Sequence, residues 1–313
     1  MTGVDPASGA WSSVETLMRR RFAAAGFAML AGAAVVSGQL SSSVFEYNRA
    51  RAFNIAVTAT EPRGPATVSQ VTYDRVTAGR TGATLVVPTG RPAVKGPGVL
   101  FVHWYEPPNP TSNRTEFVDD AVDLAGAGVV SLLVDTMWSD PKWFQSRDPE
   151  TDLGHSIEQV KELRRALDLL ASRPGVDPSR LYYVGHDFGA MYGAIVAGLD
   201  SARLKGFVFM AGTERFSEWF LLWPRRSDDA EKARVVAQTA SLDPPWYLAM
   251  PASLPMLFQF ANQDKFVPRA SADALIAAVR SPKDVRWYDA AHALNADATR
   301  DRIAWLRQRM KKP

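Results

Sequence analysis

Short apolar runs recur along most of the chain and are separated by longer stretches in which apolar and polar positions alternate with a helical period. Five of these runs, bounded by Gly or Pro, are typical of strands that are buried on both faces of a parallel sheet. They cover residues 99–102, 129–134, 181–184, 207–210 and 256–260. Further upstream, 68–76 and 81–87 have a period of two and are joined through Ala78-Gly79-Arg80, which predicts an antiparallel hairpin.

The clearest helical stretch is 156–171. Apolar residues recur there at three- and four-residue steps from Ile157 to Leu170, charged residues take the other face, and Pro174-Gly175 follows as a stop signal. Further helices are expected over 117–125, from Asp187 onward, over 270–279 and over 296–310. An antiparallel start followed by alternating strands and helices predicts an α/β fold, with a mostly parallel sheet and helices on both faces.

Residues 211–254 interrupt this alternation. No strand pattern is evident there, and the segment is rich in aromatic residues. Because it follows the run at 207–210, it should lie above the carboxyl ends of the strands, where ligands bind in such sheets. We interpret it as a short lid, with Trp219, Trp246 and Tyr247 as candidate pocket residues. The alternative is an ordinary packing segment whose aromatic residues belong to the core.

The first 45 residues differ from the rest of the chain. Three arginines, Arg19 to Arg21, precede a stretch without charge from 22 to 45. A basic segment before an apolar one is the signature of export, and it also suits membrane association through the N-terminus. The alternative is an alanine-rich helix packed on the domain of a cytoplasmic protein. The remaining residues, 46–313, are expected to form the folded catalytic domain.

Composition narrows the function. The chain has 313 residues, of which 46% are hydrophobic, enough for one large core. The net charge is only +3 and no basic stripe is interleaved with aromatics, so no nucleic-acid partner is expected. The absence of cysteine excludes disulfides and thiolate catalysis. No metal-ligand spacing or phosphate-binding glycine loop is evident, so no cofactor is expected. The oligomeric state is not indicated.

The strongest local signal is the pentapeptide Gly185-His186-Asp187-Phe188-Gly189, between a buried strand and a helix. This is the context of a nucleophile elbow, in which glycine is needed two positions before and after the nucleophile because those residues crowd each other. The central Asp187 is already ionised at neutral pH and attacks without a base. Attack on a saturated carbon gives an ester, which a histidine-activated water then hydrolyses. The alternative is that Asp187 only caps the helix.

This pentapeptide resembles the elbow of the aspartate-nucleophile branch of the α/β-hydrolase superfamily, which contains haloalkane dehalogenases, fluoroacetate dehalogenases and epoxide hydrolases. The resemblance covers roughly 67–313 in the order of elements. The segment Val176-Asp177-Pro178-Ser179-Arg180 and the short lid look more like the dienelactone-hydrolase branch, which normally carries serine or cysteine at the elbow. The resemblance implies a hydrolase of the α/β-hydrolase fold that acts on a small molecule without a cofactor.

The resemblance also implies the partners of Asp187. Asp264, in a stretch that matches D-x-x-V-P, would hold the catalytic histidine, with Glu214 as the alternative acid. His292, between a strand at 285–288 and the last helix, would activate water.

The same resemblance places the other groups of the site. The backbone amides of Phe188 and of either Trp104 or Tyr105 would form the oxyanion hole. In dehalogenases of this type indole N–H groups hold the halide, and in epoxide hydrolases lid tyrosines protonate the opening oxygen. The candidates for these roles are the indoles of Trp104, Trp138, Trp219 and Trp246, and the phenols of Tyr105 and Tyr247.

Three functions remain open from the sequence. The first is a hydrolase with an aspartate nucleophile and a covalent ester intermediate, acting on an epoxide or an organohalide. The second is a carboxylic ester or lactone hydrolase of the dienelactone-hydrolase type, in which Asp187 is an unusual nucleophile or a base for water. The third is a non-catalytic protein of the same fold that binds a small molecule. A chain that keeps Asp187, Asp264 and His292 together argues against the third.

Overall fold

The computed structural model describes residues 39–90, 94–107, 109–222 and 228–311. The predicted export signal or anchor therefore lies almost wholly outside the described residues. In the part of the chain that is described, no helix has the length and apolar character needed to cross a membrane. From Leu40 onward the chain is already packed on the domain, and Phe45 is fully buried, so the predicted boundary at residue 46 falls inside a packed segment.

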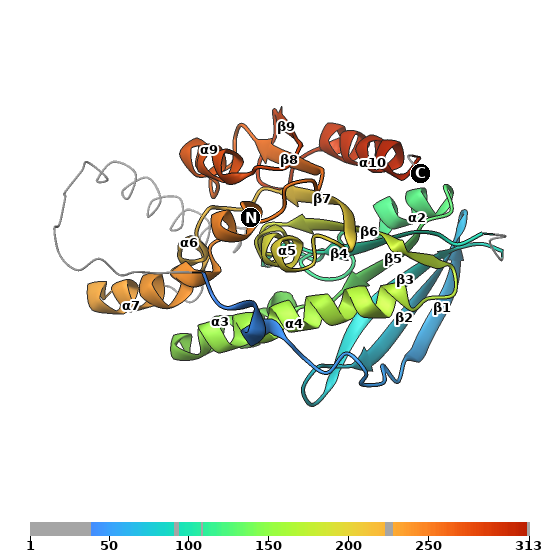
Figure 1. The fold of residues 1–313 in the computed structure, drawn as a ribbon, viewed down its shortest axis with the longest axis horizontal. Coiled ribbons are helices and arrows are strands. Elements are labelled where there is room, and N and C mark those ends of the chain that lie inside the picture. The colour runs from blue at the N-terminus through green and yellow to red at the C-terminus, as the bar shows by residue number, and fades with distance from the viewer. Residues whose placement is uncertain (1–38, 91–93, 108, 223–227, 312–313) are drawn as a thin grey trace, which may run out of the picture.

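A nine-stranded sheet in the order β1-β2-β3-β5-β4-β6-β7-β8-β9 forms the centre of the described structure (Figure 1). The strands are β1 (Ala56–Arg63), β2 (Ala66–Asp74), β3 (Arg80–Pro88), β4 (Gly96–Val102), β5 (Val130–Val134), β6 (Val176–His186), β7 (Leu204–Met210), β8 (Met256–Ala261) and β9 (Lys283–Tyr288). The pairs among β1, β2, β3 and β5 are antiparallel, and every pair from β5 through β4 to β9 is parallel. The predicted hairpin and the mostly parallel sheet are confirmed.

Helices cover both faces of this sheet, as predicted. They are α2 (Val118–Ala125), α3 (Pro141–Ser146), α4 (Asp152–Ala171), α5 (Phe188–Leu199), α6 (Phe216–Phe220), α7 (Asp229–Thr239), α8 (Pro244–Leu248), α9 (Arg269–Ala278) and α10 (Ala296–Met310), with short 3-10 turns at Ser42–Phe45, Met137–Ser139, Pro149–Thr151 and Ala240–Leu242. Successive residues of β6 point to opposite faces of the sheet. Leu181 and Tyr183 pack with α4 and α5 on one face, and Tyr182 and Val184 pack with α2 and α10 on the other.

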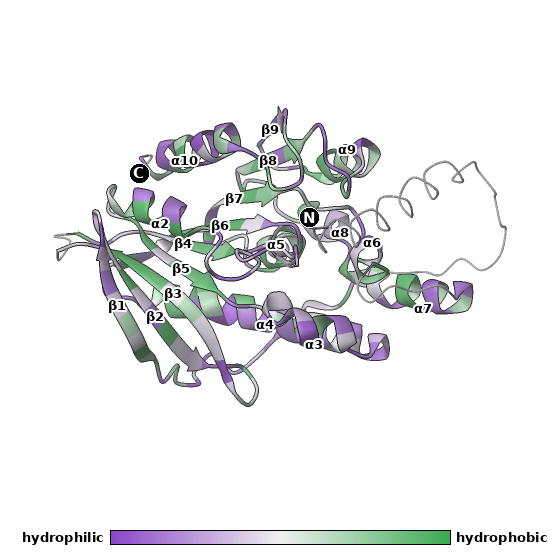
Figure 2. Cartoon of the chain, turned by 180° about the vertical axis from the view of Figure 1, so that it is seen from behind, coloured by the Kyte–Doolittle hydropathy of each residue, from purple (hydrophilic) through white to green (hydrophobic). Residues whose placement is uncertain are grey.

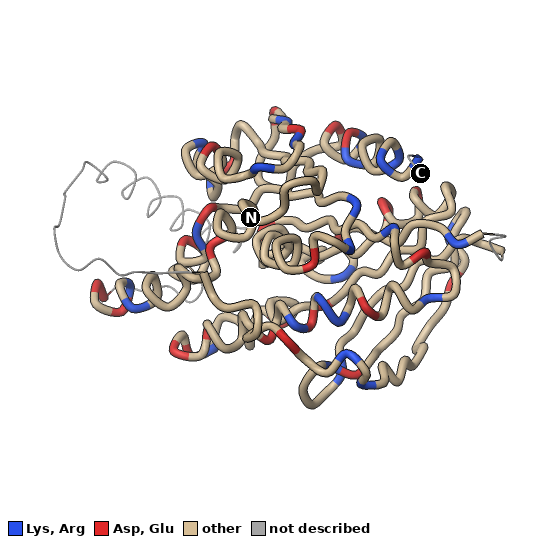
Figure 3. The backbone as a smooth tube through the Cα atoms, viewed as in Figure 1, with Lys and Arg blue, Asp and Glu red and all other residues tan. Residues whose placement is uncertain are grey.

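Polar and apolar positions are distributed as this layering requires. The central strands β4, β5 and β8 contain no charged residue and are almost entirely buried. Figure 2 shows these strands as the hydrophobic centre, and Figure 3 shows the charges gathered on the surrounding helices and turns. The eight residues of the edge strand β1 are all exposed, which explains why no apolar pattern marks it in the sequence.

The carboxyl ends of the parallel strands meet at one edge of the sheet. The turn after β4, the turn between β6 and α5, and the loops after β8 and β9 all emerge there, and ligands bind at this edge in sheets of this kind.

Candidate active site

The turn between β6 and α5 has the geometry that a nucleophile elbow requires. Asp187 adopts φ 53° and ψ −118°, a strained conformation for a residue with a side chain. A Cβ atom on Gly185 would lie 2.3 Å from the carbonyl oxygen of Gly189, and one on Gly189 would lie 2.1 Å from that of Val102. Both glycines are therefore dictated by close backbone approach. The Asp187 side chain makes no capping hydrogen bond to α5, which argues against a simple helix cap.

The two carboxylate oxygens of Asp187 have different surroundings. Oδ2 accepts a hydrogen bond of 3.1 Å from the backbone N–H of Tyr105 and lies 3.9 Å from Nε2 of His292, too far for a hydrogen bond. Oδ1 is buried and has no hydrogen-bond partner among the described residues. Burial raises the pKa of the Asp187 carboxyl, while the charge of His292 and the Tyr105 amide counteract this rise.

Asp264 and His292 lie 28 residues apart in the sequence and meet at this site. Nδ1 of His292 lies 2.8 Å from Oδ2 of Asp264, whose Oδ1 accepts hydrogen bonds from the amides of Phe266 and Val267. Burial by itself lowers the pKa of His292, but the carboxylates of Asp264 and Asp187 outweigh it and raise this pKa to about 10. The hydrogen bond from Nδ1 to a carboxylate leaves Nε2 directed at Asp187.

The loop after β4 supplies the amide that reaches Asp187. Of the two residues predicted for this role, Tyr105 donates to Oδ2 of Asp187, whereas the amide of Trp104 donates to Oε2 of Glu116 at 2.8 Å. Phe188 begins α5, so its amide is one of the first N–H groups of the helix, which lack a partner inside it. His103 is buried, its ring nitrogens form hydrogen bonds with the Trp104 carbonyl oxygen and with Oγ of Ser139, and burial lowers its pKa to about 3.

Aromatic rings enclose the remaining sides of the site. The Trp104 ring lies 6.0 Å from the His292 ring, and the Trp219 ring lies 5.4 Å from His292 and 5.8 Å from Phe188. The indole N–H groups of Trp104 and Trp219 are both buried and have no partner among the described residues. Trp138 also packs on Phe188, but its indole donates to the carbonyl of His103.

Comparison with known proteins identifies the family of the chain. The model of the family described as "Dienelactone hydrolase family" matches residues 150–308, half of the chain. The protein belongs to the dienelactone hydrolase family. It is therefore a hydrolase, and the predicted resemblance to this branch is confirmed. No curated protein matches the sequence.

Solved structures share the fold of this dienelactone-hydrolase family member at low identity. An acetyl xylan esterase from Paenibacillus sp. R4 is 18% identical, with a TM-score of 0.67 over 85% of this chain and 91% of its own. Acetyl xylan esterase 1 from Thermoanaerobacterium sp. JW/SL YS485 is 13% identical, with a TM-score of 0.68 over 87% and 95%. The dienelactone hydrolase from Anabaena variabilis ATCC 29413 is 17% identical, with a TM-score of 0.56 over 79% and 100%. The predicted α/β-hydrolase fold is confirmed.

Three of the predicted site residues lie elsewhere in this hydrolase. Tyr247 lies within 3.0 Å of the position that a Cβ on Gly198 would take, near the end of α5. Asp187 precedes the first residue of α5, and the helix separates the two positions by about 15 Å. Trp246 is 45% exposed, and its indole donates to the carbonyl of Ala240. Tyr247 of α8 therefore packs against α5 instead of covering the site, and Trp246 of the same helix lies at the surface.

Glu214 also lies apart from His292. Its carboxylate faces the guanidinium of Arg215 at 3.5 Å, and its amide donates to Ser271. The acid beside His292 in this hydrolase is Asp264.

Two residues near the triad were missed by sequence reasoning. Nε2 of His186 lies 3.1 Å from the backbone carbonyl oxygen of His292. Oε1 of Glu116 lies 2.6 Å from Nδ1 of His186. A single glutamate before a helix carries no motif, so no sequence pattern points to it.

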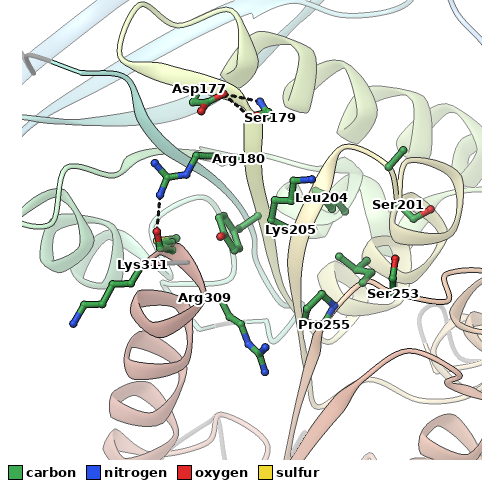
Figure 4. A pocket seen from close by; sticks show the side chains of 14 residues that line it. Asp177, Ser179, Arg180, Ser201, Leu204, Lys205, Ser253, Pro255, Arg309 and Lys311 are labelled. Atoms are coloured by element: carbon green, nitrogen blue, oxygen red, sulfur yellow. Dashed lines mark hydrogen bonds between the residues drawn. The ribbon is translucent and has the colours of Figure 1, made fainter. Parts of the chain in front are cut away.

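A cavity of about 880 Å³ lies at the other end of the sheet. Figure 4 shows Arg180, Leu204, Pro255 and Lys311 around it, from the amino ends of β6, β7 and β8 and from the end of α10. It shares no residue with the triad. Among the described residues, no group of three or more His, Cys, Asp or Glu side chains is arranged to hold a metal ion.

Proposed function

We propose that Asp187 is the nucleophile of a hydrolase that acts at a saturated carbon and forms a covalent alkyl ester with its substrate. The observation that carries this proposal is the asymmetry of the Asp187 carboxylate. Its Oδ2 is held by the Tyr105 amide, while Oδ1 is buried and unpartnered, as suits an attacking atom. A buried acceptor without a partner costs about 1–3 kcal/mol, so its presence beside a histidine points to chemistry instead of stability.

The second half-reaction then uses the groups around Oδ2. In the ester, a water attacks the carboxyl carbon of Asp187 and transfers a proton to Nε2 of His292. The oxygen at the Oδ2 position takes up the negative charge, which the Tyr105 amide stabilises. The intermediate expels the alkoxide, which takes the proton from His292, and the carboxyl group ionises again. For an organohalide, the sum is one substrate and one water converted to an alcohol, a halide ion and a proton; for an epoxide, it is one substrate and one water converted to a diol.

Formation of the ester also prepares His292 for this step. In the free enzyme the carboxylates of Asp264 and Asp187 together hold the pKa of His292 at about 10, so the ring is protonated at neutral pH. Esterification removes the charge of Asp187 and with it one of the two carboxylates. The pKa of His292 then falls, which favours the neutral ring that can accept a proton from water.

Attack at a saturated carbon suits a carboxylate better than attack at an ester. A carboxylate that adds to an ester carbonyl gives an intermediate that must expel either the carboxylate or an alkoxide. The carboxylate is far less basic and leaves first, which reverses the reaction. At a saturated carbon, displacement of a halide or opening of an epoxide has no such competition.

Between these two substrate classes, the aromatic walls favour an organohalide. The indole N–H groups of Trp104 and Trp219 are buried beside His292 and unpartnered, so a departing halide could accept hydrogen bonds from both. The phenol of Tyr105, a candidate acid for an epoxide, accepts a hydrogen bond from Gln145 and keeps its own O–H, so epoxides stay in the substrate test.

The second candidate function is hydrolysis of a carboxylic ester or lactone. Family membership favours it, and two of the similar structures are described as acetyl xylan esterases. In that reaction Asp187 would serve as a base that activates water, because it stands where a nucleophile would otherwise be.

Intact-mass spectrometry of the His292→Gln variant distinguishes these functions. Without its base the enzyme should alkylate Asp187 and stop, so the adduct accumulates. The variant is incubated with alkyl halides, haloacetates, epoxides, esters and lactones, one at a time. The matched control is the double variant Asp187→Asn/His292→Gln, which lacks the nucleophile and should gain no mass.

The mass gained identifies the reaction. An organohalide adds its alkyl group without the halogen, whereas an epoxide adds its whole mass. No adduct with any compound, while the unmutated enzyme hydrolyses an ester or lactone, would overturn the nucleophile role and support the second function.

A further inference from the structure

The largely buried carboxylate of Glu116 joins two loops of the candidate active site. Glu116 precedes α2, and its side chain is only 12% exposed. Its Oε2 accepts the Trp104 amide at 2.8 Å, and its Oε1 lies 2.6 Å from Nδ1 of His186. The next amide in the chain, that of Tyr105, donates to Asp187. Glu116 therefore fixes the residue that directly precedes the amide bound to Asp187.

His186 extends this connection to the catalytic histidine. Its Nε2 lies 3.1 Å from the backbone carbonyl of His292. Because a carbonyl oxygen only accepts, Nε2 must carry a proton, and Nδ1 then shares a further proton with the Glu116 carboxylate. The Trp104 ring stacks on His186 with a centroid distance of 4.9 Å and an interplanar angle of 14°, which fixes the plane of the imidazole.

We propose that Glu116 and His186 form a positioning pair, which holds the Tyr105 amide and the His292 ring in their places beside the Asp187 carboxylate. The pair contacts three separate segments. Glu116 binds the Trp104 amide in the loop after β4, and His186 binds the His292 carbonyl in the loop after β9. His186 also belongs to the elbow, because it precedes Asp187 in the chain. Neither residue needs to touch the substrate. The inference rests on the proposed roles of Asp187 and His292.

The pair matters most for the second half-reaction. Alkylation needs only the Oδ1 atom of Asp187 and a bound substrate. Hydrolysis of the ester needs the Tyr105 amide and Nε2 of His292 at the same carboxyl carbon, and both belong to loops that the pair holds. A misplacement of about 1 Å costs about 10²-fold in rate. Loss of the pair should therefore slow hydrolysis of the ester by about 10²-fold and its formation much less.

Two substitutions of Glu116 separate charge from geometry. Glu116→Ala removes both contacts. Glu116→Gln keeps the shape, because its amide oxygen can accept from Trp104 and its NH2 can donate to Nδ1 of His186, but it cannot share a proton. The matched control is Glu61→Gln, a carboxylate on the exposed strand β1.

The first measurement does not depend on activity. The ¹⁵N chemical shifts of the His186 ring should report both nitrogens protonated in the unmutated enzyme and in Glu61→Gln, and Nδ1 unprotonated in Glu116→Gln. A neutral His186 ring in the unmutated enzyme, unchanged in Glu116→Gln, would overturn the shared proton and with it the pair. Because this readout uses no substrate, it stands even if the nucleophile role fails.

The second measurement follows the two half-reactions in single turnovers by intact mass, with a substrate that alkylates His292→Gln. Glu116→Ala should accumulate the alkyl-enzyme that the unmutated enzyme does not, and Glu116→Gln should recover most of the hydrolysis rate. Equal slowing of both half-reactions, or none, would overturn the positioning role. If Glu116→Ala does not fold, the ester hydrolysis rate of Glu116→Gln and the ¹⁵N shifts decide.

Discussion

Replacing Asp264 by asparagine tests the chemistry with one exchanged atom, and the structure determines which way the new amide must face. Oδ1 of Asp264 accepts two backbone N–H groups, from Phe266 at 2.8 Å and Val267 at 3.1 Å. An NH2 group in that place would face two donors, so the asparagine oxygen takes it. The NH2 group then takes the place of Oδ2, 2.8 Å from Nδ1 of His292.

This orientation puts the proton of His292 on the wrong nitrogen. Nδ1 must now accept from the asparagine NH2, so Nε2 carries the proton and cannot take one from water. The same exchange in a serine-protease triad lowers the turnover rate by about 10⁴-fold, or about 5.4 kcal/mol of transition-state stabilisation. We expect a loss of this order in hydrolysis of the alkyl-enzyme formed by Asp187, with little effect on its formation.

The assay is a rapid-quench experiment that follows the released leaving group and the intact mass of the enzyme together. The Asp264→Asn variant should release about one leaving group per enzyme in a burst and then stop, with the adduct mass in place. The control is Asp289→Asn, an exposed aspartate nearby, which should turn over normally. Turnover of Asp264→Asn within about tenfold of the unmutated enzyme, or equal slowing of both steps, would refute this reasoning.

Two further predictions concern stability. Gly185→Ala places a Cβ 2.3 Å from the carbonyl oxygen of Gly189 and should lower the free energy of unfolding, measured by urea denaturation, by about 3 kcal/mol. The control is Gly154→Ala in α4, where a Cβ would have no atom within 4 Å and should raise this free energy by up to about 1 kcal/mol. Similar values for both variants would contradict the crowded turn. Burial raises the pKa of Glu218 to about 7 from 4.5, so the folded state holds its proton over a range where the unfolded state has lost it, and stability falls as pH rises through this range. Thermal unfolding of Glu218→Gln should show a shallower fall between these pH values, and an identical slope would contradict the buried position.

Much of the fold is predictable from the sequence because its signals are local. A strand buried on both faces of a sheet must be apolar at consecutive positions, and five such runs correspond to β4 through β8. The crowding at Gly185 is equally local, since a Cβ there would meet the carbonyl of Gly189 four residues later, whereas Gly189 is required by the approach of Val102 from β4. In contrast, β1 has eight exposed residues and no apolar period, so only its pairing with β2 makes it a strand.

The candidate site is less predictable because its contacts join residues far apart in the chain. The family resemblance implied Asp264 and His292 and left Glu214 as the alternative acid, and only the folded loops bring Nδ1 of His292 to Asp264. The choice between the amides of Trp104 and Tyr105 depends on Glu116, which accepts the first and leaves the second for Asp187.

In the aromatic segment after β7, too, the sequence predicts one property and the tertiary structure determines another. Its composition indicated a cover for the site, and Trp219 of α6 does lie against His292. Tyr247 of α8, which looks equivalent in the sequence, packs at the far end of α5. Hydrophobicity alone determines that these aromatic rings are buried. Which surface buries each of them depends on the paths of α6 and α8, and those paths are set by contacts with distant elements that no local pattern encodes.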